Sequence, residues 1–263
     1  MTAVAGVRGG GPAVVHAPSI AVQLDRVSKS FGRKRVLEQV SFSVEKGTGV
    51  VILGRSGTGK SVTLKTIIGL VQPDGGRVLV NGEDVCGMTR EHLNEVRRRI
   101  GFLFQNAALF DSITVGENVA FPLRRHTNLK EREIRDRVRE KLEQVGLESE
   151  SNKMPAALSG GMRKRAGLAR AMVLDPPLLL VDEPSAGLDP LTTDEIDDLL
   201  ASLKERAHTT LVVVTHNMAS ARKLADRLVM LHEGRIEAEG TLAEFERSDH
   251  PLVRAFMASE DIG

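Results

Sequence analysis

The glycine-rich segment at residues 54–61 constrains the fold of this chain more than any other feature. It follows the apolar run Val50–Leu53, and a helical pattern of spaced apolar residues begins directly after it at Val62. A buried strand, a glycine-rich loop and a helix in this order are typical of α/β proteins whose loop N–H groups surround a phosphate. The segment therefore predicts a parallel sheet with an anion site at the end of a strand. Its residues are Gly54, Arg55, Ser56, Gly57, Thr58, Gly59, Lys60 and Ser61.

Two side chains of this loop have distinct predicted tasks. Lys60 is expected to reach the β- and γ-phosphates of a nucleotide, and Ser61 is expected to offer its hydroxyl to Mg²⁺. The alternative is a glycine-rich turn without a ligand. The complete spacing and both flanking elements favour the phosphate loop.

Adjacent carboxylates follow a second buried strand. The run Leu178–Val181 is continuously apolar and ends in Asp182 and Glu183, at the edge where an α/β sheet binds ligands. We expect Asp182 to face the Mg²⁺ shell and Glu183 to address a water at the γ-phosphate as general base. Acidic residues after a strand can also cap a helix, but together with the phosphate loop they favour nucleotide hydrolysis.

The remaining pattern predicts two kinds of sheet. Alternating apolar residues from Ile20 and across Val36–Val44 indicate antiparallel strands with one solvated face, whereas the continuous run Leu211–Val214 indicates a strand buried on both faces. Arg77–Val80 and Leu228–Ile236, with turns at Asn81-Gly82 and Glu233-Gly234, are interpreted as hairpins at sheet edges.

A helical segment interrupts this sheet. Residues 100–105 are interpreted as a strand, and residues 106–158 are rich in helix signals, so we expect an inserted helical subdomain there. Within it, Lys130–Val145 places Ile134, Val138 and Leu142 on one stripe of a helix that ends near Gly146. We predict an ATPase domain at 19–245, preceded by a flexible tail at 1–18 and followed by a C-terminal extension at 246–263.

Composition excludes several classes of protein. Lys and Arg number 36 and Asp and Glu 35, so the net charge of +1 gives no overall attraction to nucleic acid. Cys86 is the single cysteine, which excludes an intramolecular disulfide and a multi-cysteine zinc site and favours a reducing compartment. No apolar run approaches the roughly 20 residues that span a bilayer, so any membrane component is expected on a separate chain.

The segment Leu158-Ser159-Gly160-Gly161-Met162 identifies a family. Ser159 is a natural N-cap for a helix with Ala166, Ala169 and Val173 among its buried residues. Placed between the phosphate loop and the Asp-Glu strand end, the segment resembles the signature of ATP-binding cassette (ABC) proteins. The resemblance spans about residues 20–240. It implies an α/β fold with the RecA-like core of P-loop NTPases and an added antiparallel β subdomain. It also implies that Ser159, Gly160 and Gly161 contact an anion. Met162 departs from the usual Gln, so no side-chain hydrogen bond is carried over there.

Further positions match the family in order. By resemblance, Gln105 joins the catalytic and metal site and links it to a membrane partner, Asp189 lies in the loop that crosses a dimer interface, and His216 contacts the γ-phosphate. A lone His at a strand end is more often structural, so His216 depends on this context. Phe31 occupies the position where the family stacks an aromatic ring on adenine. Trp and Tyr are absent, and the alternative for Phe31 is core packing.

The resemblance also implies an assembly. ATP and Mg²⁺ are expected between the phosphate loop of one copy and the Ser-Gly-Gly segment of a second copy, so that ATP binding closes the pair and hydrolysis reopens it. The pair would drive an integral membrane permease. Chromosome-type members with a long coiled coil, excision-repair members with zinc cysteines, and ATP sensors without a base fit the sequence less well.

Three segments indicate a subfamily within the ABC proteins. Residues 109–124, the Leu-Ser-Gly-Gly-Met form and residues 249–256 resemble the ATPase of Mla-type phospholipid transporters, which work with Mce-domain proteins. The expected place is then the cytoplasmic face of the inner membrane, held peripherally by the permease. An ATPase subunit of an amino-acid or ion importer is the alternative. The segment after Gln105 is where the family docks its permease, or else it packs only within the helical subdomain.

Overall fold

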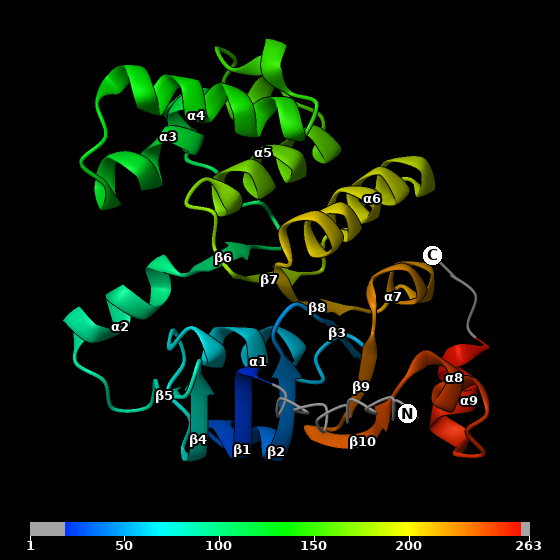
Figure 1. Cartoon of the computed structure of the whole chain (residues 1–263). Coiled ribbons are helices and arrows are strands. Elements are labelled where there is room, and N and C mark those ends of the chain that lie inside the picture. The colour runs from blue at the N-terminus through cyan, green and yellow to red at the C-terminus, as the bar shows by residue number, and fades with distance from the viewer. Residues whose placement is uncertain (1–18, 259–263) are drawn as a thin grey trace, which may run out of the picture.

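The computed structural model describes residues 19–258, so the predicted tail at 1–18 and residues 259–263 of the predicted extension lie outside the described residues. Within residues 19–258, the strands form two sheets, with helices on both sides of the larger one (Figure 1). The strands are β1 (Ile20–Phe31), β2 (Lys34–Glu45), β3 (Gly49–Leu53), β4 (Gly75–Val80), β5 (Glu83–Asp84), β6 (Ile100–Leu103), β7 (Leu178–Asp182), β8 (Thr210–Thr215), β9 (Arg227–His232) and β10 (Arg235–Gly240).

The helices follow the same chain order. They are α1 (Lys60–Ile67), α2 (Arg90–Arg98), α3 (Val115–His126), α4 (Glu131–Gln144), α5 (Gly160–Met172), α6 (Pro190–Ala207), α7 (Met218–Leu224), α8 (Leu242–Glu246) and α9 (Pro251–Met257), with short 3₁₀ turns η1 (Glu148–Glu150) and η2 (Pro155–Ala157). None of the helices in the described part of the chain is both long and apolar enough to cross a membrane.

The larger sheet has the order β10-β9-β3-β8-β7-β6. Strands β9, β3, β8, β7 and β6 are parallel, and β10 pairs antiparallel with β9. Every residue of β3, β7 and β8 is buried, which confirms that the continuous apolar runs form central strands covered on both faces. The smaller sheet, β2-β1-β4-β5, is antiparallel, as the alternating N-terminal pattern predicts.

The two predicted hairpins form, but each has only one strand at an edge. Asn81 and Gly82 have φ values of 50° and 83°, and Glu233 and Gly234 have 46° and 80°, which is the left-handed pair that a tight hairpin turn requires. Strand β5 ends one sheet and β10 ends the other, whereas β4 and β9 lie inside their sheets. The prediction of edge hairpins is therefore wrong for β4 and β9. The sequence does not show that β9 also pairs with β3.

Two cores lie on opposite faces of the larger sheet, because alternate residues of β3 point in opposite directions. Val51 and Leu53 pack with the helices α3 to α7. Val50 and Ile52 pack with α1 and the antiparallel sheet. The fold is the predicted α/β P-loop core with an added antiparallel sheet and a helical layer.

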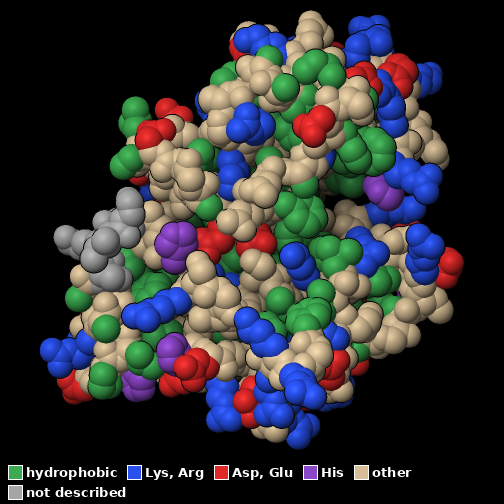
Figure 2. Space-filling model, turned by 180° about the vertical axis from the view of Figure 1, so that it is seen from behind, with side chains coloured by type: hydrophobic (Ala, Val, Ile, Leu, Met, Phe, Trp, Pro, Cys, Tyr) green, Lys and Arg blue, Asp and Glu red, His purple; other side chains and the backbone are tan. Residues whose placement is uncertain are grey.

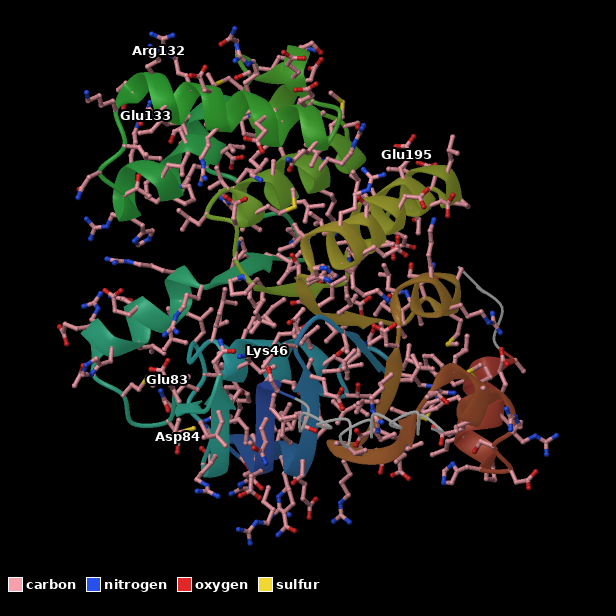
Figure 3. All side chains as sticks on the ribbon, in the orientation of Figure 1. Lys46, Glu83, Asp84, Arg132, Glu133 and Glu195 are labelled. Atoms are coloured by element: carbon pink, nitrogen blue, oxygen red, sulfur yellow. The ribbon has the colours of Figure 1, made fainter. Side chains whose placement is uncertain are left out.

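The helical layer at the top of Figure 1 consists of α3, α4 and α5, and α5 packs against both other helices. The predicted apolar stripe of Ile134, Val138 and Leu142 is buried on α4, and Gly146 follows with φ of 65°. Arg132 and Glu133 are exposed at the outer end of α4 (Figure 3). Residues 106–158 were expected to hold the helical subdomain, and the packed layer continues past them through α5.

Candidate nucleotide site

The phosphate loop leaves β3 and turns directly into α1. Two of its glycines are required by close approaches of the backbone. A Cβ atom on Gly54 would lie 2.3 Å from the carbonyl oxygen of Leu231, and one on Gly59, where φ is 109°, would lie 2.7 Å from that of Val36. The loop therefore fits against the β2 and β9 ends only with glycine at these positions.

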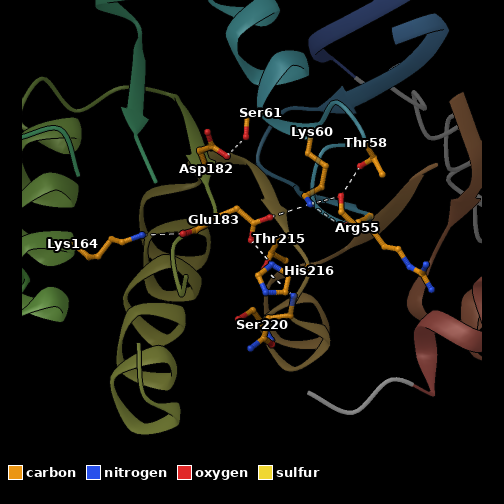
Figure 4. A network of polar contacts seen from close by, with 12 residues as sticks. Arg55, Thr58, Lys60, Ser61, Lys164, Asp182, Glu183, Thr215, His216 and Ser220 are labelled. Carbon is orange, nitrogen blue, oxygen red and sulfur yellow. Dashed lines mark hydrogen bonds and ion pairs between the residues drawn. The ribbon is translucent and has the colours of Figure 1, made fainter. Parts of the chain in front are cut away.

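Lys60 is the first residue of α1 and is buried, with 5% of its surface exposed. Its Nζ donates to the carbonyl oxygens of Gly54 at 2.6 Å and Arg55 at 3.2 Å. It also lies 3.0 Å from Oε1 of Glu183 (Figure 4). The ammonium group thus stands at the centre of the loop, where it can meet phosphate oxygens.

Ser61 and Asp182 come together as the sequence predicts. The Ser61 hydroxyl donates to Oδ1 of Asp182 over 2.7 Å. Burial raises the pKa of Asp182, and the Ser61 hydrogen bond opposes that rise. Among residues 19–258 no cluster of three or more His, Cys, Asp or Glu could hold a metal ion. A hydroxyl and one carboxylate beside a phosphate loop suit Mg²⁺, which takes few protein ligands and completes its shell with phosphate and water oxygens.

Glu183 lies immediately after β7 in a left-handed backbone conformation, with φ of 45°. Its N–H donates to the carbonyl oxygen of Val214 over 2.9 Å. Its carboxylate lies between Lys60 and His216, and Nδ1 of His216 is 2.9 Å from Oε2 (Figure 4). The His216 side chain remains 57% exposed, so it lines the open side of the site while Glu183 is buried.

One residue of this network was not predicted. Lys164, on α5, is 6% exposed and its Nζ donates to the carbonyl oxygen of Glu183 over 2.9 Å (Figure 4). Burial lowers the pKa of Lys164 to about 8, while Asp182 and Glu183 act in the opposite direction. A signal exists in the sequence: Lys164 shares the buried stripe of α5 with Leu168 and Met172, at helical spacing.

The start of α5 has the predicted cap. Oγ of Ser159 accepts a hydrogen bond from the N–H of Met162 over 3.2 Å. A Cβ atom on Gly161 would lie 2.3 Å from the Thr192 side chain. The glycine therefore allows the first turn of α5 to pack closely on the first turn of α6.

Asp189 has a local task in the structure. It caps α6, and its carboxylate accepts from the Thr192 N–H at 3.0 Å and from the Thr192 hydroxyl at 2.6 Å. These hydrogen bonds lower the pKa of Asp189. Its carboxylate is thus held at the start of α6, next to the first turn of α5.

Two predicted residues lie apart from the network. Gln105 is exposed two residues beyond β6, and its side chain forms no hydrogen bond with the part of the chain that the structure describes. Phe31 ends β1 with 51% of its surface exposed, and Nζ of Lys29 lies 5.5 Å from its ring centroid. Phe31 is therefore not a core residue, and its ring is free to stack on a planar ligand.

A cavity of about 840 Å³ opens beside the phosphate loop. Its wall includes Gly54 and Ser56 of the loop, Leu188 of the segment before α6, His216, and Phe256 of α9. Figure 2 shows positive and negative side chains side by side over the rear face of the molecule. The hollow is bounded by several of the predicted nucleotide-site elements.

Comparisons with known proteins show the family of the chain. The sequence profile of the ABC transporter family matches residues 37–186. The chain is 45% identical over 244 residues to the "Probable ribonucleotide transport ATP-binding protein mkl" of Mycobacterium leprae, covering 93% of this chain and 70% of the relative. It is 39% identical over 242 residues to the "Intermembrane phospholipid transport system ATP-binding protein MlaF" of Haemophilus influenzae, covering 92% of each.

A solved structure has the same fold. It is the ATP-binding cassette MJ0796, described as a dimer in a post-hydrolysis state bound to ADP and Pi. Its TM-score is 0.79 at 35% identity, over 84% of this chain and 98% of the cassette. The chain therefore belongs to the ABC transporter family, as an ATP-hydrolysing, ATP-binding subunit.

Proposed function

We propose that this chain binds Mg-ATP between two copies of itself and powers phospholipid movement through a separate membrane permease. The main observation in favour of an ATPase site is the buried contact of Lys60 with Glu183 beside the loop Gly54–Ser61. The phospholipid assignment rests on the MlaF relative, which matches over nearly its whole length, and on residues 109–124 and 249–256.

The proposed chemistry divides the work among residues of one chain. Lys60 and the loop N–H groups bind the β- and γ-phosphates, and their positive charge stabilises the charge that develops during phosphoryl transfer. Ser61 and Asp182 would hold Mg²⁺, which when bound neutralises phosphate charge. Glu183 accepts a proton from the attacking water. His216 holds the second carboxylate oxygen of Glu183 and lines the γ-phosphate side.

The proposed dimer completes each site. The residues of α5 pack in the core on one face of the larger sheet and those of α1 in the core on the other. We assign the N–H groups of Ser159, Gly160 and Gly161 to the nucleotide held by the Lys60 of a second copy. Asp189, at the start of α6 beside α5, then lies at the interface, and Phe31 stacks on adenine from the antiparallel sheet.

The permease would dock on the segment after Gln105. There Phe110 and Phe121 are 45% and 46% exposed, and their ring centroids lie 4.9 Å apart. Arg170 of α5 donates to the carbonyl oxygens of Ala107 and Ala108, which fixes the segment to the helix that carries the Ser-Gly-Gly turn. Two adjacent exposed rings are an apolar surface of the kind that protein partners cover. In this assignment Gln105 connects the surface to the metal site.

The transported molecule is tested with the whole complex. The chain is purified with its permease in detergent, and co-purified lipids are identified by mass spectrometry. The expected result is enrichment of phospholipid together with an Mce-domain protein. In the cell, we expect the permease to hold the chain peripherally at the cytoplasmic face of the inner membrane. In a double-membraned host, gene deletion should alter phospholipid distribution in the outer envelope. Selective loss of amino-acid or ion uptake with normal lipids would instead favour the importer ATPase.

A further inference from the structure

The backbone of Glu183 is held by three hydrogen bonds. Its N–H donates to Val214, and its carbonyl oxygen accepts from the N–H of Ala186 at 3.3 Å and from Nζ of Lys164 at 2.9 Å. A left-handed conformation is unfavourable for a residue with a Cβ and persists only where the surroundings hold it. These bonds therefore fix the direction in which the Glu183 side chain leaves the backbone.

The Lys164 bond is unlike the other two. It comes from a side chain 19 residues away, on a helix outside the loop that follows β7. Nζ of Lys164 is buried, and it donates to a neutral carbonyl oxygen although the carboxylates of Asp182 and Glu183 lie close enough to act on its charge. A charged donor to a buried carbonyl oxygen makes a strong hydrogen bond. Its loss would leave the carbonyl oxygen with only the longer hydrogen bond from the N–H of Ala186.

We propose that Lys164 is a positioning residue that holds the backbone of Glu183 so that its carboxylate faces Lys60 and the phosphate loop. The inference rests on the proposed role of Glu183 as general base. Lys164 contacts the backbone of Glu183 and acts on the reaction only through that residue.

The test compares Lys164→Met with Lys164→Gln in the full chain. Methionine keeps an unbranched side chain and removes the donor, whereas glutamine keeps an N–H donor on a side chain one atom shorter. We expect Lys164→Met to lower kcat for ATP hydrolysis by roughly tenfold, within the range of positioning effects, with nucleotide affinity within about twofold of the unmodified chain. Lys164→Gln should recover part of kcat. Affinity is measured with a fluorescent ATP analogue and folding by thermal melting.

Lys141→Met is the matched control. Lys141 is buried on α4 with 7% exposed and pairs with Asp175 at 2.7 Å, away from Glu183. It should lower the melting temperature without lowering kcat at a temperature where the chain is folded. Equal kcat losses in the two Met variants, or a normal kcat in folded Lys164→Met, would overturn the proposal.

A double variant separates this inference from the proposed function. Because Lys164 acts through Glu183, adding Lys164→Met to Glu183→Gln should not lower the single-turnover rate further. A further loss would show that Lys164 acts on another group and would contradict the inference. Near-normal hydrolysis by Glu183→Gln alone would overturn the proposed base. A large loss in Glu183→Gln with a normal rate in Lys164→Met would overturn only the role of Lys164.

Discussion

Nζ of Lys60 and Oε1 of Glu183 lie 3.0 Å apart in a buried part of the site. The same ammonium also donates to the carbonyl oxygens of Gly54 and Arg55, so three protein oxygens surround it. A phosphate that binds Lys60 has to replace at least one of them. Phosphate binding and the freedom of the Glu183 carboxylate are therefore coupled through a single lysine.

Replacing Lys60 should abolish both binding and turnover. Lys60→Ala removes a charge that acts on the bound nucleotide as well as on the transition state. It also leaves Glu183 buried without its cation. We expect ATP affinity to fall at least about tenfold and hydrolysis to become undetectable above background. Affinity within a factor of two of the unmodified chain, measured by equilibrium binding, would show that Lys60 does not contact phosphate.

Replacing Phe31 should weaken affinity more than turnover. Stacking of a base on an aromatic ring contributes roughly 1–3 kcal/mol, so Phe31→Ala should raise the Kd for ATP about five- to hundredfold while kcat at saturation stays closer to normal. Phe121→Ala is the control, because it removes a ring of similar exposure on α3. If both variants bind ATP alike, Phe31 is not the adenine platform.

Charge on the Phe110–Phe121 surface should uncouple the chain from its permease. Phe121→Asp places a carboxylate in an apolar contact, and we expect roughly tenfold less permease in pull-downs, in line with loss of an aromatic anchor. ATP affinity should be unchanged. Leu70→Asp is the control, since Leu70 is 52% exposed just after α1. Equal pull-down by Phe121→Asp and the unmodified chain would place the permease elsewhere.

The buried carboxyl of Asp197 predicts a pH dependence of stability. Burial raises its pKa from 3.8 to about 6, and an acid with a raised folded-state pKa destabilises the folded chain as pH rises from about 4 through 6. Asp197→Asn should therefore raise the free energy of unfolding by about 1–3 kcal/mol at pH 8, with little effect near pH 4. Melting curves at both pH values measure this.

The control for that prediction is Glu195→Gln, two residues before Asp197 and on the exposed side of α6. Glu195 is exposed and points outward in Figure 3, so its neutralisation should change melting little at either pH. Destabilisation by Asp197→Asn at pH 8 would show that the carboxylate is stabilised by its surroundings rather than penalised by burial.

Much of the site could be predicted because its parts are local in sequence. The loop Gly54–Ser61 with its flanking strand and helix, and the carboxylates at the end of β7, are each short patterns, and together they favour a nucleotide site over a plain turn or a helix cap. Strands β3 and β7 both pair parallel with β8, so their carboxyl ends meet at one edge of the sheet and Ser61 reaches Asp182. The cap at Ser159 is confirmed for the same reason, since a cap depends only on the next three residues.

Features that depend on packing between distant segments could not be predicted. Lys164 was missed because a lysine on a helical stripe becomes a buried donor only when the carbonyl of Glu183 meets it. The inner position of β9 depends on β3, more than 170 residues earlier. The same limit applies to Gln105. The sequence predicts its position after β6, but among the described residues its side chain has no hydrogen-bond partner.

Glu183→Gln should separate ATP binding from ATP hydrolysis. Glutamine keeps the shape of the side chain and removes the base, whose contribution is roughly 10²- to 10⁴-fold. With Mg-ATP, the variant should bind nucleotide normally and persist as a dimer on a sizing column.

The decisive measurement is the ATP hydrolysis rate of Glu183→Gln at saturating Mg-ATP, with the permease present to support dimerisation. A rate at least about tenfold lower than that of the unmodified complex, with ATP still bound, is the predicted result. A near-normal rate would contradict the assignment of Glu183 as the base.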